Sequence, residues 1–206
     1  NIITDYAKKM GGVPECSVIG AGFATSPYLA ALVNGTVGHA LDYDDIAVSL
    51  IGHPSVFLAP AILAIGESVE ASGEDILTAY VIGYEAACGV AGPILQSHYV
   101  RGWHSTATFG SLGAAAAAAW LLKLNVSQVR MALGIAASLA GGLRQSFGTM
   151  TKPLHAGKAA ANGVQAALLA QMEFTADESI IEAPLGFARV FGHNEEVDWA
   201  KASENL

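Results

Sequence analysis

Three short segments of the chain carry the side chains best suited to proton transfer and to binding an anion. The first combines Asp42-Tyr-Asp-Asp45 with Gly52-His-Pro-Ser55, the second is Arg101-Gly-Trp-His-Ser-Thr106, and the third runs from Arg144 to Lys158. Histidine gives and takes protons most readily near neutral pH. A lysine beside a substrate carboxylate stabilises the charge that develops when the adjacent carbon loses a proton. These residue types favour proton-transfer chemistry on an anionic substrate without a metal or an organic cofactor.

Three of these basic side chains lie just before predicted helices. The spacing of apolar residues predicts helices over 26–44, 55–70, 73–92, 106–123, 127–140 and 153–172. A helix N-terminus presents unpaired N–H groups and a positive dipole end, which suits carboxylates. We therefore expect His53, His104 and Lys152 to converge on one pocket for a ligand with several carboxylates. We interpret His39 as a core residue, and His98 and His193 as solvated.

The composition predicts one all-α domain with closely packed helices. Hydrophobic residues make up 52% of the 206 residues and charged residues 14%, which excludes a disordered chain. Six consecutive alanines, Ala114 to Ala119, lie inside an uncharged stretch that we interpret as a buried helix and not as a membrane span. Only Cys16 to Ile19 offers a β-compatible run. Two cysteines and no secretory signal favour a reducing compartment, and we expect a cytoplasmic protein.

Charge is distributed unevenly along the sequence. The net charge of −8 makes a duplex nucleic-acid binder a poor interpretation. No Lys or Arg occurs between Lys9 and Arg101. From Arg101 to Met172 the pattern inverts, with no Asp or Glu and six cations: Arg101, Lys123, Arg130, Arg144, Lys152 and Lys158. A positive segment inside an acidic protein predicts local attraction for an anion.

Several standard sites are missing from the sequence. It contains no G-x-x-x-x-G-K-[ST], no H-E-x-x-H and no G-x-S-x-G, so we predict neither a P-loop nor a metal site nor a common hydrolase. The run Asp42-x-Asp44-Asp45 matches the acid motif of helical terpenoid cyclases. Those enzymes line their cavities with aromatic residues, and an aromatic content of 8% argues against that class. A helical binding or assembly module without catalysis is a further alternative.

These motifs resemble the MmgE/PrpD family, which includes 2-methylcitrate dehydratase, cis-aconitate decarboxylase and iminodisuccinate epimerase. The matching text is Asn34-Gly-Thr-Val-Gly-His-Ala-Leu-Asp-Tyr-Asp-Asp45, Gly52-His-Pro-Ser55, Gly102-Trp-His104 and Leu143-Arg-Gln-Ser-Phe-Gly-Thr-Met-Thr-Lys-Pro-Leu-His-Ala-Gly157. By resemblance, the active-site Asp of the family falls on Asp42, its two helical-domain histidines on His53 and His104, and its lysine on Lys152. Asp45 and His155 lie in the same motifs, and we expect them to bind substrate together with His104 and Lys152.

The resemblance also implies a function and a domain arrangement. It implies a cofactor-free lyase like 2-methylcitrate dehydratase, in which a histidine removes the proton α to a carboxylate and a β-hydroxyl leaves. A decarboxylase or epimerase of the same family, or a non-catalytic carboxylate-binding module, are the alternatives. Ile46 stands where cis-aconitate decarboxylases carry a Thr. The resemblance further implies a homodimer, and a single helical domain over residues 1–206 that lacks the α+β lid domain and part of the active site, so that this chain alone would turn over little substrate.

Overall fold

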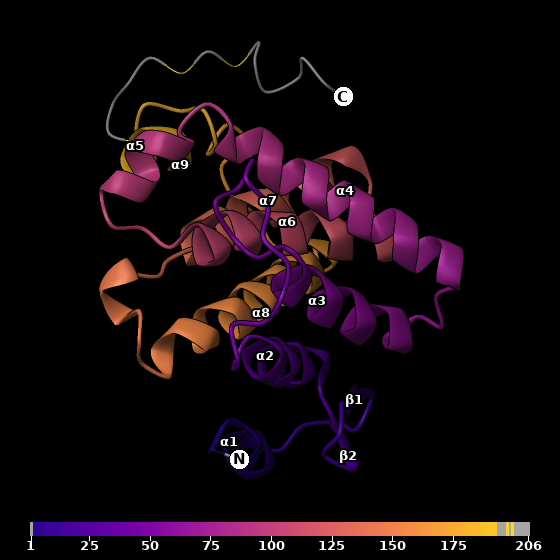
Figure 1. Cartoon of the computed structure of the whole chain (residues 1–206). Helices are drawn as coiled ribbons and strands as arrows, with labels where there is room; N and C mark the ends of the chain where they lie inside the picture. Colours follow the sequence, from indigo (N-terminus) through magenta and orange to yellow (C-terminus); the bar gives the residue numbers. More distant parts are fainter. Residues whose placement is uncertain (1, 193–196, 198, 200–206) are drawn as a thin grey trace.

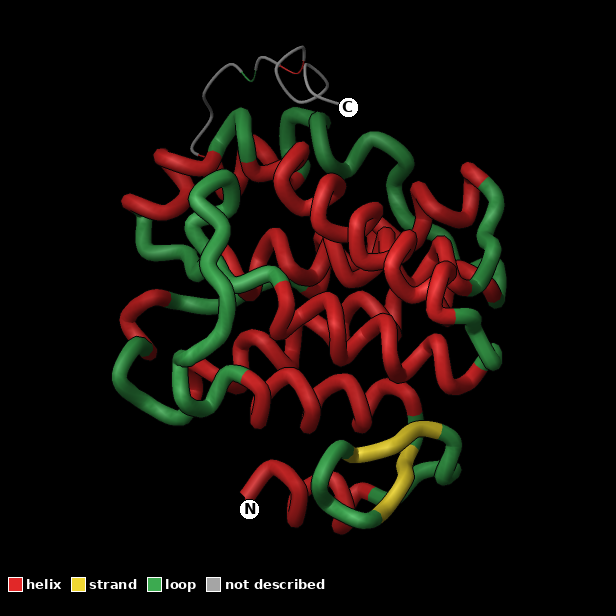
Figure 2. Tube along the Cα trace, turned by 45° about the vertical axis from the view of Figure 1, so that its right-hand side comes forward, coloured by secondary structure: helices red, strands yellow, loops and turns green. Residues whose placement is uncertain are grey.

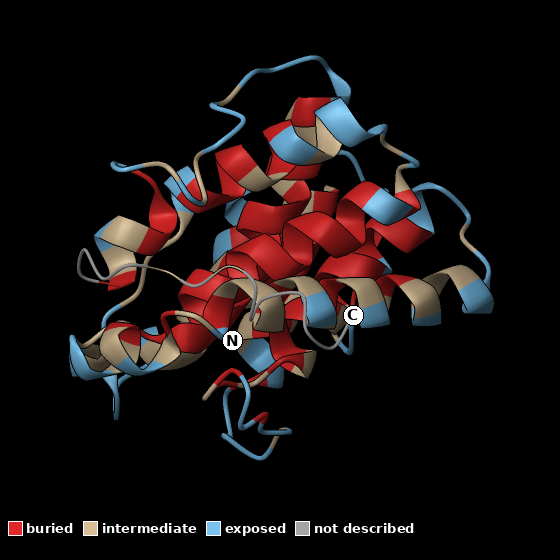
Figure 3. Cartoon of the chain, turned by 90° about the horizontal axis from the view of Figure 1, so that it is seen from above, coloured by how far each residue is buried: buried red, intermediate tan, exposed pale blue. Residues whose placement is uncertain are grey.

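Helix α6 (Ser105–Leu121) occupies the centre of the fold in the computed structural model, which describes residues 2–192, 197 and 199. Every residue of α6 except Trp120 is buried. The other helices are α1 (Ile2–Met10), α2 (Pro27–Gly38), α3 (Ser55–Ser68), α4 (Gly73–Ala91), α5 (Leu95–Val100), α7 (Val126–Leu139), α8 (Thr151–Gln171) and α9 (Phe187–Gly192). Helices α3, α4, α7 and α8 pack against α6, and α2 and α1 lie farther out (Figure 1). Figure 3 shows the buried residues concentrated in the central helices. The prediction of a helical domain with a buried alanine-rich helix is confirmed.

Small residues set how closely the central helices approach one another. At the crossing of α4 and α6, a Cβ atom on Gly83 would lie 2.7 Å from the carbonyl oxygen of Gly113, and one on Gly113 would lie 2.6 Å from that of Gly83. Interaxial distances depend on the side chains at the contact, so two facing glycines allow backbone to touch backbone. The high glycine and alanine content is therefore used for helix–helix contact.

Two of the helix boundaries that differ from the predictions affect the candidate site. The helix predicted over 26–44 ends at Gly38, and Asp42 adopts a left-handed φ of 52° that reverses the chain. Carboxylates are unfavourable at a helix C-terminus, which is consistent with this early end. The helix predicted from Pro153 begins at Thr151, so Lys152 lies in its first turn.

A two-stranded antiparallel sheet is the exception to the helical architecture among the described residues. Strand β1 (Cys16–Val18) pairs with β2 (Phe23–Thr25), with Ser17 opposite Ala24. The hairpin lies beside α1, at the edge of the domain (Figure 2). The predicted β-compatible run is thus a strand, although it ends one residue early. Among the described helices, none is long and apolar enough to cross a membrane.

The prediction that His98 is solvated is wrong. Residues 95–100, which lie between the helices predicted over 73–92 and 106–123, form α5, and His98 on this helix is fully buried. Its Nε2 lies 2.8 Å from the hydroxyl of Thr108, and its ring contacts those of Phe109 and Phe191. Burial lowers the pKa of His98 to about 4, so the ring is neutral at physiological pH. His193 lies outside the described residues.

Candidate functional site

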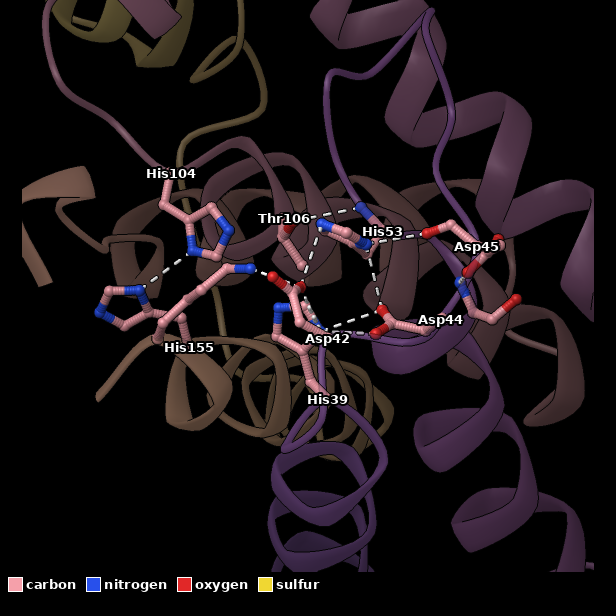
Figure 4. Close-up of polar contacts among 10 residues, drawn as sticks. His39, Asp42, Asp44, Asp45, His53, His104, Thr106 and His155 are labelled. Atoms are coloured by element: carbon pink, nitrogen blue, oxygen red, sulfur yellow. Dashed lines mark hydrogen bonds and ion pairs between the residues drawn. The ribbon is translucent and has the colours of Figure 1, made fainter. Parts of the chain in front are cut away.

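The three predicted segments meet where α2 ends and where α3, α6 and α8 begin (Figure 4). The ammonium of Lys152 lies 2.5 Å from Oδ1 of Asp42, across 110 residues of sequence. Nε2 of His53 lies 3.7 Å from the same oxygen. The rings of His104 and His39 stack with their centroids 6.4 Å apart. The structure therefore brings the predicted Asp, Lys and histidines into one cluster.

Asp42 and Lys152 form the charged pair of the cluster. The side chain of Asp42 is 54% exposed, whereas that of Lys152 is 14% exposed. The hydrogen bond from Lys152 lowers the pKa of the Asp42 carboxyl, which therefore stays ionised. The ammonium also lies 5.3 Å from the centroid of the Phe147 ring, within range of a cation–π contact. The lysine is thus enclosed by the fold, while its carboxylate partner faces outward.

His53 follows a strained loop, which holds it in the cluster. Ala47 and Gly52 close the loop through an isolated β-bridge, and Ile51 between them has a left-handed φ of 45°. This conformation is unusual for a β-branched residue and costs roughly 1–3 kcal/mol. The backbone N–H of His53 donates to the hydroxyl of Thr106 at 3.2 Å. The loop is thereby fastened to the first turn of α6, next to His104.

His104 and His155 form a pair of uncharged imidazoles. Their Nδ1 atoms lie 3.0 Å apart. Burial is the main cause that lowers the pKa of His104 to about 3, and burial also lowers the pKa of His155. Since both rings are neutral near pH 7, one Nδ1–H donates and the other Nδ1 accepts. The backbone of His104 is held by its N–H donating to the carbonyl of Gly142 at 3.0 Å.

Sequence reasoning missed the role of His39 and Asp44. His39 is buried, as predicted for a core residue, but its Nδ1 lies 3.0 Å from both carboxylate oxygens of Asp44. Asp44 Oδ2 lies 3.2 Å from Nδ1 of His53 as well. The one available signal was position, because His39 precedes Asp42 by three residues and so could reach the same turn.

Asp45, which is expected to bind substrate, makes two contacts within the protein, and its substrate role stays a prediction. Its Oδ1 accepts the backbone N–H of Ser55 at 3.1 Å, at the start of α3. A carboxylate in this position satisfies an unpaired N–H and the positive end of the helix dipole. The backbone carbonyl of Asp45 also accepts from Nδ1 of His53 at 2.9 Å. Asp45 therefore supports the position of His53.

The six cations of the acid-free segment do not gather at the cluster. Lys158 donates to the hydroxyl of Tyr28 at 3.0 Å, and Arg130 pairs with Glu178 at 3.3 Å. Of the six, Lys152 is the one whose described contacts lie in the cluster. That the acid-free segment attracts an anion stays a prediction, and within the cluster Lys152 is the cation that could bind one.

Four donors in the cluster are spaced closely enough to surround a small ion. One ligand atom each from His39, Asp42, Asp44 and His53 lies within 4.8 Å of the others. Lys152, at 2.5 Å from Asp42, already neutralises one of the two carboxylates. A cation bound by all four donors would therefore have to share Asp42 with the ammonium. That the protein works without a metal stays a prediction.

The chain is similar to proteins of a known family. The MmgE/PrpD N-terminal domain model matches residues 1–200. Cis-aconitate decarboxylase from Mus musculus is 32% identical over 201 residues, which cover 93% of this chain and 40% of the relative. The Homo sapiens protein of that name is 34% identical over 176 residues, 81% of this chain and 36% of the relative.

A fungal relative gives a similar match. Cis-aconitate decarboxylase from Aspergillus terreus is 32% identical over 184 residues, 85% of this chain and 38% of the relative. The chain thus spans about two fifths of the length of these relatives. A family match over nearly the whole chain removes the terpenoid cyclase alternative. The chain belongs to the MmgE/PrpD family.

Proposed function

We propose that the protein is a lyase that acts on a di- or tricarboxylate by proton transfer, without a cofactor. The observation that carries the proposal is the cluster itself, in which one enclosed ammonium, Lys152, lies among four imidazoles. Burial is the main cause that lowers the pKa of three of them, His39, His104 and His155. Neutral imidazoles can accept a proton from carbon or pass one on, and the ammonium stabilises a neighbouring carboxylate.

The substrate has to compete with a group of the protein. The carboxylates of Asp42 and Asp44 outnumber the ammonium of Lys152, and burial keeps His39, His104 and His155 neutral, so net charge does not attract a polyanion. We expect one substrate carboxylate to take the place of Asp42 at Lys152. Asp42 is the exposed partner of the pair and can turn toward water at low cost.

Two lyase reactions fit the same groups. In a dehydration, a base removes the proton α to a carboxylate, a C=C bond forms, and the β-hydroxyl takes up a proton and leaves as water. In a decarboxylation, the C–C bond to a carboxylate breaks, CO2 leaves, and the remaining carbon takes up a proton. Each reaction needs one residue that moves a proton and one cation beside a carboxylate that remains. His53 or His104 would serve as the first and Lys152 as the second.

The relatives and the sequence point to different members of this reaction class. The matched relatives are named cis-aconitate decarboxylases, which supports cis-aconitate as the first substrate to test. Ile46 is 71% exposed beside the acidic turn, and by the resemblance it stands where those enzymes carry a Thr. This departure favours 2-methylcitrate dehydration as the second candidate.

Turnover decides between these two reactions. The product of the complete reading frame is purified and offered cis-aconitate and 2-methylcitrate separately. Release of CO2 from the first, or formation of an alkene and water from the second, supports a lyase and identifies the reaction. A matched pair of variants, Lys152→Met and Lys158→Met, tests whether the activity depends on the cluster. Both lysines lie on α8, and of the two Lys152 is the one that contacts Asp42. Absence of both reactions, or equal rates in the two variants, would overturn the proposal.

A further inference from the structure

Asp44 is a carboxylate enclosed between two imidazoles. Its side chain is 10% exposed, against 54% for Asp42. Nδ1 of His39 lies 3.0 Å from both of its oxygens, and Nδ1 of His53 lies 3.2 Å from Oδ2. Figure 4 shows Asp44 on the side of the cluster opposite His104, with its carboxylate directed at these rings. Its position therefore suits a role that acts through the histidines.

The contacts of Asp44 determine which nitrogen of each ring carries the proton. An ionised carboxylate only accepts hydrogen bonds, so a ring nitrogen within hydrogen-bonding distance of it must be an N–H. In a neutral imidazole the other nitrogen, Nε2, is then an unprotonated acceptor. For His39 the opposite tautomer would place a lone pair against the carboxylate. It would also leave a buried N–H at Nε2, which has no hydrogen-bond partner in the structure.

The two histidines depend on Asp44 to different degrees. Nδ1 of His53 has a second acceptor, the backbone carbonyl of Asp45 at 2.9 Å. Among the described contacts, Nδ1 of His39 has the Asp44 carboxylate as its only hydrogen-bond acceptor. The ring of His39 packs against that of His53 with centroids 4.7 Å apart. A change in the orientation of His39 would therefore be transmitted directly to His53.

The open nitrogen of His53 faces the reacting part of the cluster. Its Nε2 lies 3.7 Å from Asp42 Oδ1, the oxygen that Lys152 holds. The ring is 14% exposed, so a ligand at Lys152 can reach it, whereas His39 is fully enclosed. With Nδ1–H directed at Asp44 and the Asp45 carbonyl, Nε2 is the nitrogen that can accept a proton from a substrate.

We propose that Asp44 is a positioning residue, which fixes the Nδ1–H tautomer of His39 and, through the packed pair of rings, aims the unprotonated Nε2 of His53 at the substrate. The catalytic part of this inference rests on the proposed function, and the tautomer part does not. Asp44 does not touch the substrate in this arrangement. It acts as the buried carboxylate does in His–Asp pairs, where replacement by Asn presents the wrong tautomer.

Side-chain nitrogen NMR of the histidines tests the tautomers directly. In the parent chain, treated with a chelator, we expect His39 and His53 to carry the proton on Nδ1. Asp44→Asn offers one acceptor oxygen and adds an N–H donor, so His39 should shift toward the Nε2–H form, while His53 keeps the Asp45 carbonyl. The neighbouring Asp45→Asn is the matched control and should leave His39 unchanged. An Nε2–H proton on His39 in the parent, or no change in Asp44→Asn, would overturn the proposal.

Kinetics on the product of the complete reading frame test the consequence. Asp44→Asn should lower kcat at least about tenfold with a smaller change in KM, because the substrate contacts at Lys152 are retained. Asp44→Glu, which keeps a carboxylate, should recover part of kcat and the Nδ1–H signal of His39. A parent-like kcat and pH profile in Asp44→Asn would refute positioning. If the parent turns over neither substrate, the proposed function fails while the NMR result still decides the tautomers.

Discussion

Replacing Gly157 by alanine should separate the two helices that carry the charged pair of the cluster. Gly157 lies in α8, one and a half turns after Lys152, and faces α2, which leads to Asp42. A Cβ atom at Gly157 would overlap the carbonyl oxygen of Leu32 and the hydroxyl of Thr36, and would lie 2.7 Å from the backbone nitrogen of Thr36. Two of these three neighbours are backbone atoms, so the helices have to move apart.

The size of the effect follows from two opposing contributions. Overpacking a well-packed contact costs about 1–3 kcal/mol, and the upper end applies because backbone atoms cannot rotate away. Alanine is favoured over glycine inside a helix by about 1 kcal/mol. The net loss in the free energy of unfolding is therefore about 2 kcal/mol. For a domain of this size that lowers Tm by about 4–8 °C.

Thermal unfolding followed by circular dichroism measures this loss. Gly73→Ala is the matched control, since Gly73 opens α4 and a Cβ atom there meets nothing within 4 Å. We expect this control to leave Tm unchanged or to raise it slightly. If Gly157→Ala were as stable as Gly73→Ala, the close approach of α2 and α8 would be wrong. The distance between Asp42 and Lys152, which depends on that approach, would then be wrong as well.

Three further predictions concern the histidines and the effect of chelators. The folded-state pKa values of His98 and His104, about 4 and about 3, lie below the unfolded value of about 6.5, so the unfolded chain binds protons first as pH falls. The free energy of unfolding should therefore be constant above pH 7, and each histidine should lower it by about 2 kcal/mol at pH 5. This loss is measured as a lower Tm at pH 5. A Tm that does not change between pH 7 and 5 would contradict these burial effects. His104→Gln should lower kcat about a hundredfold in a protein that turns over substrate, and an unchanged kcat would remove His104 from the reaction. Chelators should change neither Tm nor turnover, because Lys152 already neutralises Asp42; inactivation by a chelator would require a metal at this cluster.

Much of the helical framework could be predicted from local sequence. The alanine run from Ala114 to Ala119 could only be buried inside a helix bundle, and it lies in α6. Ser72 followed by acidic residues predicts a helix start, and its side chain does accept the N–H of Asp75 at 3.1 Å. These features depend on neighbours within a few residues, which the sequence displays directly.

The features that the sequence predicted wrongly or did not predict depend on contacts between distant segments. His98 lies among polar neighbours in sequence, yet α5 buries it against Phe109 and Phe191. The pairing of Lys152 with Asp42 spans 110 residues and is created by the packing of α8 on α2. The motifs identified both residues as candidates, but no local pattern specifies which carboxylate an ammonium will choose.

The contact between Asp44 and His39 could not be predicted for a related reason. Asp42, Asp44 and Asp45 are chemically alike in the sequence, and the left-handed turn at Asp42 decides which way each side chain points. One carboxylate then pairs with a lysine, one with two histidines, and one caps α3. A single backbone conformation thus separates three roles that composition cannot distinguish.

Calorimetric titration with cis-aconitate tests the central claim, that Lys152 is the carboxylate anchor of a polycarboxylate site. The titration compares the parent with Lys152→Met and with the matched variant Lys158→Met at constant pH and salt. We predict that Lys152→Met raises Kd at least about tenfold, equivalent to about 1.4 kcal/mol, because a substrate carboxylate loses its charged partner. Lys158→Met should bind as the parent does. Equal affinity in all three proteins, or no binding by the parent, would contradict the claim.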